Sequence, residues 1–347
     1  MRLRPVDNPP NPYASRHAEW LEPPPDARIT VYEETGGSIL SRNDSPDIPF
    51  TWSVNPYRGC QHACGYCYAR TSHEYLGFGA GTDFDTKLVV KRNAPALLRE
   101  AFSKRSWSRE TVNFSGVTDC YQPIEACYEL TRACLDVCVA FRNPAVVVTK
   151  AYLVVRDAGV LSALHACAGA AVWMSVTSTD AKVARLMEPQ APPPARRFAA
   201  IRRLADAGVP VGVMLAPIIP GLNDCEIPAI LQQAADAGAR SASGQALRLP
   251  DRVADVFIKR LRETMPARAE RVLGLVRGMR GGALNCGRFG ERMRGRGPHW
   301  DAIVRLMALS KRRLGLDRPL PRTRMGPGAA AATGPAPAQL AFEFGPP

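Results

Sequence analysis

The sequence predicts an α/β fold in which helices cover a parallel sheet, and three observations lead to this prediction. Short runs rich in Val, Ile, Thr and other apolar residues alternate with longer segments of helical periodicity. These runs are apolar almost throughout, as in strands that are buried on both faces. Ala-Gly pairs at 207–208 and 237–238 end two helical segments just before the next strand. About six strand–helix units are visible where a complete barrel has eight, so we expect a partial (β/α)6 TIM-like barrel.

The expected elements alternate along the chain. The candidate strands share a short, mostly apolar run and cover 51–55, 111–115, 145–149, 171–177, 210–217 and 241–249. The candidate helices share periodic apolar positions and cover 94–103, 125–141, 153–167, 194–207, 226–237 and 251–264. Two more helices, at 267–279 and 299–314, follow the last strand as a C-terminal helical appendage. An active site in such a barrel lies at the carboxyl ends of the strands.

Composition divides the chain into four parts. Residues 1–50 are rich in Pro, Asn, Asp and Gly, which predicts an irregular N-terminal arm. The partial barrel is expected over 51–264 and the basic helical appendage over 265–317. The Pro, Gly and Ala content of 318–347 predicts a disordered tail.

The net charge of +13 is concentrated late in the chain. Between Lys259 and Arg324 there are 18 Lys or Arg against 5 Asp or Glu, an excess equal to the net charge of the whole chain. A surface of this kind suits a polyanion such as nucleic acid. Only 7 of the 45 basic residues are Lys, however, and heavy use of Arg with Ala, Gly and Pro also reflects genome composition. Both interpretations stay open.

The sequence indicates a cytoplasmic protein. No run approaches the roughly 18 apolar residues that a membrane span needs. The first ten residues have no apolar stretch after their basic residues, so they do not predict a secretory signal. In the cytoplasm, ten cysteines indicate metal ligands, catalytic thiols or small buried residues rather than disulfides.

Three cysteines lie within eight residues, directly after the first expected strand. Cys60, Cys64 and Cys67 have the spacing C-x-x-x-C-x-x-C. Thiolates this close can hold a [4Fe–4S] cluster and leave one iron open to a small molecule. Structural zinc takes four closed ligands, and His62, between the first two cysteines, is badly placed to be the fourth. A nucleic-acid-binding module with a structural metal site remains the alternative, as does a scaffold protein that keeps a cluster without substrate chemistry.

The cysteine motif resembles that of the radical S-adenosylmethionine (SAM) enzymes. In that superfamily the open iron binds SAM, and an electron from the cluster cleaves its sulfonium to methionine and a 5′-deoxyadenosyl radical. Three segments narrow the resemblance to the bacterial spore photoproduct lyase-like proteins named DNA repair photolyases. These segments are 64–70 (CGYCYAR), 115–125 (SGVTDCYQPIE) and 288–290 (RFG). The similarity covers about residues 50–315.

The resemblance implies which residues bind the cofactors. The three clustered cysteines match the cluster ligands. The positions that match SAM-binding residues are Tyr66, Gly116, Thr118, Asp119, Lys150, Ser175, Ile219 and Gly221. Among these, the segment 116–119 matches the site of the SAM amino group, and Lys150 the residue that pairs with its carboxylate. Ser175 matches a ribose contact, and Ile219 and Gly221 the strand end that cradles adenine. Glu188 with Arg196 or Arg197 would complete the pocket.

The resemblance also implies how hydrogen atoms and electrons are transferred. Tyr68 matches a tyrosine of the lyases that relays a hydrogen atom. Their hydrogen-donating cysteine corresponds to Gly116, and Cys120 is the nearby thiol that could act in its place. This departure makes SAM-dependent radical chemistry a firmer expectation than the lyase reaction. The expected partners are a reductant such as flavodoxin or ferredoxin, and nucleic acid. The sequence leaves the oligomeric state open.

Overall fold

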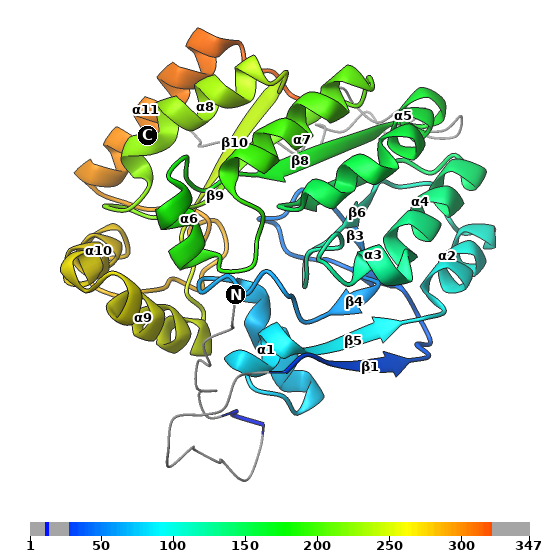
Figure 1. Cartoon of the computed structure of the whole chain (residues 1–347), viewed down its shortest axis with the longest axis horizontal. Helices are drawn as coiled ribbons and strands as arrows, with labels where there is room; N and C mark the ends of the chain where they lie inside the picture. Colours follow the sequence, from blue (N-terminus) through cyan, green and yellow to red (C-terminus); the bar gives the residue numbers. More distant parts are fainter. Residues whose placement is uncertain (1–10, 14–27, 321–347) are drawn as a thin grey trace.

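Within residues 11–13 and 28–320, which the computed structural model describes, a seven-stranded sheet forms the centre of the fold (Figure 1). Its order is β10-β9-β8-β7-β6-β3-β2, with six parallel strands and an antiparallel β2 at one edge. The strands are β2 Leu40–Arg42, β3 Trp52–Val54, β6 Val112–Phe114, β7 Ala145–Thr149, β8 Ala170–Ser175, β9 Val211–Ile218 and β10 Ser241–Ala246. The predicted α/β fold, with a partial barrel of six parallel strands, is confirmed.

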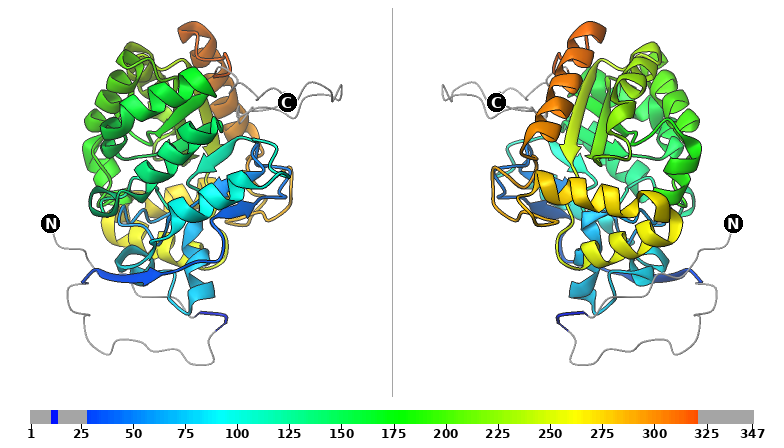
Figure 2. Two further views of the ribbon diagram at one scale, coloured as in Figure 1. Left: turned by 90° about the vertical axis from the view of Figure 1, so that its right-hand side faces the viewer. Right: turned by 90° about the vertical axis from the view of Figure 1, so that its left-hand side faces the viewer.

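Helices cover the outside of this sheet (Figures 1 and 2). They are α2 Ala94–Ser103, α4 Leu130–Phe141, α5 Ala158–Cys167, α7 Pro194–Asp206, α8 Ile227–Asp236 and α11 Pro298–Leu314. Apolar strand residues such as Phe114, Val147 and Val172 have no exposed surface and belong to the main core cluster. Because the strands are buried on both faces, their sequences are apolar in succession instead of alternating. Among the described residues, no helix is long and apolar enough to cross a membrane.

The helices expected as one basic appendage pack in two different places. Helix α10 (Pro266–Met279) packs against α9 (Arg252–Thr264), whereas α11 packs against α8 and β10. Figure 1 shows these two groups on separate parts of the molecule. Helix α11 buries Trp300, Ile303 and Met307 on one face, and this apolar face seats it on the barrel.

A second, three-stranded sheet lies beside the barrel. It has the order β1-β5-β4, formed by β1 Thr30–Glu34, β5 Lys87–Lys91 and β4 Tyr57–Arg58. The short helices η1 (Tyr68–Leu76) and α1 (Thr82–Thr86) connect β4 to β5. Strands β1 and β2 fall within residues 1–50, where the sequence predicts an irregular arm. Both strands are mostly exposed, so neither shows the apolar pattern that predicts a strand.

Other elements position the loops at the carboxyl ends of the strands. These are α3 (Glu125–Tyr128), η2 (Tyr152–Asp157), α6 (Ala181–Met187) and η3 (Asp224–Glu226). Of the predicted tail, residues 321–347 lie outside the described part. Within the part of the tail that is described, Leu320 is 8% exposed and packs with Val146 and Trp173.

The single helix expected over 125–141 is two helices, α3 and α4. They meet at Glu129, which has a φ of +50°. The carboxylate of Glu125, which has no exposed surface, accepts hydrogen bonds from the backbone N–H groups of Thr131 (2.9 Å) and Arg132 (3.2 Å). Glu125 thereby satisfies N–H groups at the start of α4 that would otherwise lack partners. A buried glutamate that caps the next helix is not visible in apolar periodicity.

Gly59, between β4 and Cys60, has a φ of +75° in a crowded place. A Cβ atom there would lie 2.8 Å from the carbonyl oxygen of Lys87 and 3.0 Å from that of Phe84. Gly77 has the same φ, but nothing lies within 4 Å of a Cβ atom. Substitutions at these two glycines therefore separate the free-energy cost of a left-handed backbone from that of steric overlap.

We expect Gly59→Ala to lower the free energy of unfolding by about 2–5 kcal/mol. About 1–2 kcal/mol comes from the left-handed backbone, and the remainder from overlap with backbone atoms that cannot rotate away. Gly77→Ala should cost only about 1–2 kcal/mol. Urea denaturation followed by circular dichroism measures both values. If both variants lost the same free energy of unfolding, the tight fit of Gly59 against the second sheet would be contradicted.

Candidate active site

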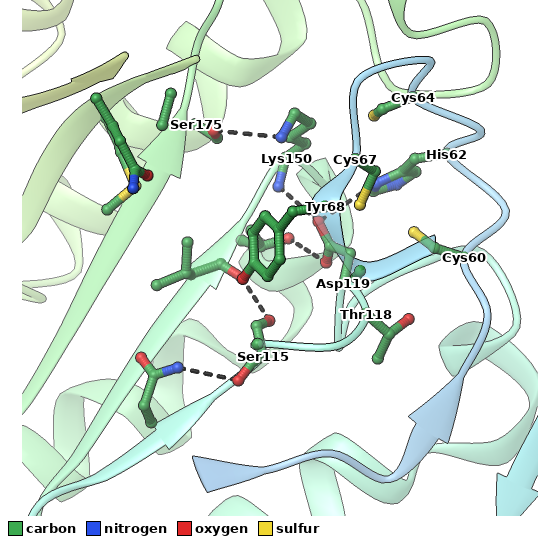
Figure 3. A pocket seen from close by; sticks show the side chains of 18 of the residues that line it. Cys60, His62, Cys64, Cys67, Tyr68, Ser115, Thr118, Asp119, Lys150 and Ser175 are labelled. Carbon is green, nitrogen blue, oxygen red and sulfur yellow. Dashed lines mark hydrogen bonds and ion pairs between the residues drawn. The ribbon is translucent and has the colours of Figure 1, made fainter. Parts of the chain in front are cut away.

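A cavity of about 190 Å³ opens at the carboxyl ends of the parallel strands (Figure 3). Residues 59–67, here called the cysteine loop, contribute to one part of its wall. The ends of β6, β7 and β8 and side chains of β9 and β10 supply others. The predicted site residues that line it are Cys60, Cys64, Cys67, Tyr68, Gly116, Thr118, Asp119, Lys150 and Ser175. They come from separate segments of the sequence, and the parallel sheet brings them to the same edge.

The three thiols of the cysteine loop line this cavity together. Cys60 and Cys64 are buried, and Cys67 is partly exposed. Burial raises the pKa of all three thiols, that of Cys64 to about 12 although the Lys150 ammonium opposes the shift. Such a set of soft ligands favours binding of a cationic group that stabilises the thiolates. Within residues 11–13 and 28–320, no three His, Cys, Asp or Glu side chains form a group that could hold a single metal ion.

Arg70 forms hydrogen bonds to the backbone of the cysteine loop. Its side chain has no exposed surface, and its guanidinium donates to the carbonyl of Cys64 through Nε (3.0 Å) and Nη2 (2.8 Å). Nη1 donates to the carbonyls of Ala80 (2.9 Å) and Gly81 (2.8 Å), and Nη2 also to Asp85 (2.7 Å). All five guanidinium N–H groups can thus be used within the protein.

A second buried arginine reaches the same loop from α9. Arg260 donates from Nη1 to the carbonyl of Ala63, and its Nη2 lies 3.7 Å from the Asp85 carboxylate. Its side chain passes over Gly65, where a Cβ atom would lie 2.8 Å from Arg260 Cδ. Burial raises the pKa of Asp85 even though both guanidiniums oppose the shift. Sequence reasoning missed these residues, because only Arg70 lies near the cysteine motif and nothing marks its partners.

Two glutamines fasten the cysteine loop to the end of β6. The N–H of Gln61 donates to Gln122 Oε1 (2.8 Å), and the N–H of Ile124 donates to Gln61 Oε1 (2.7 Å). Gln122 Nε2 also donates to the carbonyl of Gly59 (3.0 Å) and to the hydroxyl of Thr118 (2.8 Å). The Thr118 hydroxyl in turn donates to the Gly59 carbonyl. Thr118 lines the cavity, but its hydroxyl hydrogen is engaged in holding the loop.

Asp119 organises the loops around the cavity. Its Oδ1 accepts from the N–H of Tyr121 (2.9 Å) and the hydroxyl of Thr149 (2.7 Å), and its Oδ2 from the N–H of Lys150 (2.8 Å). His62 Nδ1 lies 3.3 Å from Oδ2. Burial raises the pKa of Asp119, but His62 and these hydrogen bonds outweigh it and lower the pKa to about 2. Because protein groups occupy both oxygens, Asp119 positions its neighbours instead of offering a free carboxylate to a ligand.

Lys150 presents an ammonium group to the cavity. Its Nζ donates to Ser175 Oγ (3.3 Å, Figure 3). The same Nζ lies 5.8 Å from the ring centre of Tyr66. Burial lowers the pKa of Lys150, but the charges of Cys64 and Glu188 outweigh it and raise the pKa. The group therefore stays cationic next to the thiols.

Tyr66 lies behind Lys150, outside the cavity lining. Its hydroxyl donates to Glu188, which also pairs with Arg197 and accepts from the Thr177 hydroxyl (2.8 Å). Arg197 Nη1 donates to the carbonyl of Ser175 (3.2 Å), at the end of β8. Burial raises the pKa of Glu188, but Arg197 and Lys150 outweigh it and lower the pKa to about 2. The expected Glu188–Arg197 contribution is thus a buried ion pair that supports the cavity wall.

Besides Tyr66, three expected site residues do not line the cavity. Cys120 has no exposed surface and belongs to the apolar core, where the hydroxyl of Thr131 donates to its carbonyl (2.7 Å). Ile219 is 1% exposed and also packs in the core. Gly221 faces α10, since a Cβ atom on it would lie 2.7 Å from Leu275 Cδ1. The sequence indicates that these residues follow strand ends, but not the direction in which they point.

Comparison with known proteins identifies the family. The sequence model of the radical SAM superfamily matches residues 54–234, more than half of the chain. This chain belongs to the radical SAM superfamily. The family implies a [4Fe–4S] cluster and SAM, and three thiols that line one cavity beside an ammonium group fit these cofactors.

Curated relatives of this radical SAM protein have no described function. The uncharacterized protein Rv2578c of Mycobacterium tuberculosis is 38% identical over 214 residues, which cover 61% of this chain and 63% of the relative. The uncharacterized protein MJ0683 of Methanocaldococcus jannaschii is 31% identical over 173 residues, 50% of this chain and 62% of the relative. The chain therefore spans less than two thirds of the length of these two relatives.

Solved structures of spore photoproduct lyase have a similar fold. One variant of that enzyme matches with a TM-score of 0.58 and 16% identity, covering 87% of this chain and 85% of the lyase. The lyase complexed with dinucleoside spore photoproduct matches with a TM-score of 0.53 and 18% identity, over 68% and 67% of the two chains. At this level of identity the similarity concerns the fold.

The ion pair of Glu188 predicts how stability depends on pH. Its folded pKa of about 2 lies below its ordinary value of 4.5, so its contribution is complete above pH 4.5 and is lost as the pH falls toward 2. We expect about 2–3 kcal/mol of stability to be lost over this range. Urea unfolding of the cluster-free protein at several pH values measures this loss.

Two variants test the assignment to Glu188. Glu188→Gln should be less stable near neutral pH and should show a shallower decline toward low pH. Glu100→Gln, which changes an exposed glutamate of α2, should keep the wild-type dependence. The same decline in all three proteins would contradict the role of Glu188.

Proposed function

We propose that this protein is an enzyme that cleaves SAM reductively, with a [4Fe–4S] cluster held by Cys60, Cys64 and Cys67. The observation that carries the proposal is that three thiols, two of them buried, and the Lys150 ammonium line the same cavity. When bound, these cofactors supply a 5′-deoxyadenosyl radical, formed together with methionine by one-electron cleavage of the sulfonium. Three protein ligands leave one corner of the cluster available to the amino and carboxylate groups of SAM.

The side chains around the cavity would bind and orient SAM. Lys150 is the group for the carboxylate, because it is cationic and held by Ser175. We assign Ser175 to a ribose hydroxyl, because it lines the cavity at the end of β8 beside Lys150. Ser115 and Gly116 have φ values of +103° and +136°, so the backbone after β6 takes a conformation that L residues rarely adopt. Residues of 116–119 line the cavity after this bend, and we assign this segment to the SAM amino group.

Tyr68 is the residue we propose for hydrogen-atom relay. It lines the cavity directly after the last cysteine and is 49% exposed, which leaves it accessible to a substrate at the cavity mouth. Cys120 has the required thiol chemistry but is packed in the core. We therefore assign the relay to Tyr68 alone. Flavodoxin or ferredoxin would supply the electron.

Nucleic acid is the substrate class that we propose. The basic excess between Lys259 and Arg324 suits a polyanion. A solved structure with a similar fold is that of a lyase complexed with a dinucleoside photoproduct. Gly116 stands where the spore photoproduct lyases have their hydrogen-donating cysteine. The reaction on the substrate therefore differs from theirs in its hydrogen donor.

Cleavage of SAM tests the proposal directly. Anaerobic reconstitution with iron and sulfide, followed by dithionite and SAM, should yield 5′-deoxyadenosine, measured by liquid chromatography. Cys64→Ala should abolish the product because one cluster ligand is lost. Cys127→Ala, a change of an exposed cysteine, should retain it. Product formation by Cys64→Ala at the wild-type rate would contradict the ligand assignment.

The affinity for SAM tests the role of Lys150. Lys150→Ala should weaken SAM binding by about 1.5–3 kcal/mol, the usual contribution of a hydrogen bond to a charged group. Lys182→Ala removes an exposed lysine of α6 and should bind SAM as the wild type does. Isothermal titration calorimetry of the reconstituted proteins measures the difference. Equal affinities for all three proteins would remove Lys150 from the SAM site.

A further inference from the structure

The segment after α10 forms a fixed loop, here called the arginine loop (residues 280–297). Arg280 is 8% exposed, and its guanidinium holds four backbone carbonyls. Nη2 donates to the carbonyls of Leu247 (2.7 Å) and Arg292 (3.1 Å), and Nη1 to those of Glu291 (3.2 Å) and Arg294. The loop has no helix or strand within it, so this buried arginine determines its shape.

The arginine loop adjoins the cavity of the proposed active site. The N–H of Ala246, at the end of β10, donates to the carbonyl of Met293 (3.3 Å). The Met293 sulfur contacts Gln245, which lines the cavity, and lies 3.6 Å from Arg248 Nη1. The Arg248 guanidinium lies 5.9 Å from the ring centre of Tyr68. Through these contacts, the arginine loop packs directly against residues that line the cavity.

Phe289, near the middle of this loop, is 62% exposed. The guanidinium of Arg292 lies 4.5 Å from its ring centre. Arg292 is itself fixed, because its Nε donates to Asp47 (2.6 Å), whose other oxygen accepts from the N–H of Gly290 (2.6 Å). A supported aromatic ring that remains mostly exposed is ready to contact another flat group.

Exposed arginines lie in the same loop as Phe289. Arg288 is 72% and Arg296 is 64% exposed, and both pair with Glu291. Arg294 is also exposed. With Arg292, this short segment carries four arginines against one glutamate. Guanidinium groups bind phosphate oxygens well, so charge favours a phosphate backbone at this surface.

We propose that Phe289 and the arginines around it bind a nucleic-acid strand beside the cavity, with an unpaired base stacked on the Phe289 ring. The inference rests on nucleic acid as the substrate class proposed above, and it names the surface and the form of the strand. Bases stack on aromatic side chains without strong sequence preference, and arginine adds a cation–π contribution. The bases of an intact duplex are already stacked on one another. This surface therefore selects a single-stranded or locally opened strand.

Fluorescence anisotropy with labelled oligonucleotides tests the stacked base. For the reconstituted full-length protein, Phe289→Ala should weaken binding of single-stranded DNA about 5- to 100-fold, the effect of losing one base–aromatic stack. Phe289→Trp should retain the affinity because it keeps an aromatic ring. Leu309→Ala removes a similarly exposed apolar side chain (59%) from α11 and should bind like the wild type. Intact duplex DNA should bind more weakly and should be much less sensitive to Phe289→Ala.

The salt dependence of binding tests the arginines. Arg294→Ala should reduce the slope of log affinity against log salt by about 0.7–0.9, as expected for one lost phosphate contact on a single or double strand. Arg105→Ala, which changes an exposed arginine after α2 and outside the basic segment 259–324, should leave the slope unchanged. If Phe289→Ala bound single strands with wild-type affinity, the proposed stacking of a base on Phe289 would be wrong. If Arg294→Ala left the salt dependence of binding unchanged, the proposed phosphate contact of Arg294 would be wrong.

A separate assay distinguishes this inference from the proposed function. The wild-type protein is tested for 5′-deoxyadenosine formation without nucleic acid. If SAM is cleaved but no oligonucleotide binds, the inference about the arginine loop is wrong and the SAM chemistry stands. If oligonucleotides bind through Phe289 but SAM is not cleaved, the binding surface stands and the proposed function fails.

Discussion

The positions of the three thiols depend on two buried guanidinium groups. The cysteine loop is neither helix nor strand, so its buried carbonyls have no partners in regular secondary structure. Arg70 and Arg260 supply donors for the carbonyls of Cys64 and Ala63, and Asp85 balances part of their charge. A buried ion pair adds little net stability, because desolvation offsets most of the attraction. Its effect here is to hold the loop in one arrangement, with the thiols toward the cavity.

This constraint connects distant parts of the chain. Arg260 and Ala63 are 197 residues apart in sequence, and α9, which carries Arg260, follows the last strand of the barrel. The contacts that hold the cysteine loop therefore include one from a helix at the far end of the barrel sequence. The reciprocal bonds of Gln61 and Gln122 connect the same loop to the end of β6. These contacts link the thiols to the segment after β6 that is proposed to bind SAM.

The sequence predicts the parts of this fold that repeat or cluster. Apolar runs mark the barrel strands because these strands are buried on both faces, and the cysteine spacing stands out because three ligands are close in sequence. Strand-end residues such as Lys150 and Ser175 follow from family resemblance and from parallel topology. Contacts between single, distant side chains leave no such pattern. The hydrogen bonds of Arg70 and Arg260 to the cysteine loop are visible only in the structure. The same is true of the cap that Glu125 forms on α4.

Local sequence also does not determine the direction of a side chain in a loop. Cys120 follows Asp119 at the end of β6, yet Asp119 lines the cavity and Cys120 packs in the core. Gly221 lies in the turn after β9 but faces α10. In both cases tertiary packing decides which side of the loop faces the cavity.

Electron paramagnetic resonance of the reduced, reconstituted protein tests the central claim most directly. If three thiolates hold a [4Fe–4S] cluster whose remaining iron is open to SAM, the protein should contain equal amounts of iron and sulfide. Its reduced cluster should give a signal that changes when SAM is added. A cluster signal that SAM leaves unchanged, or zinc in place of iron, would contradict the account.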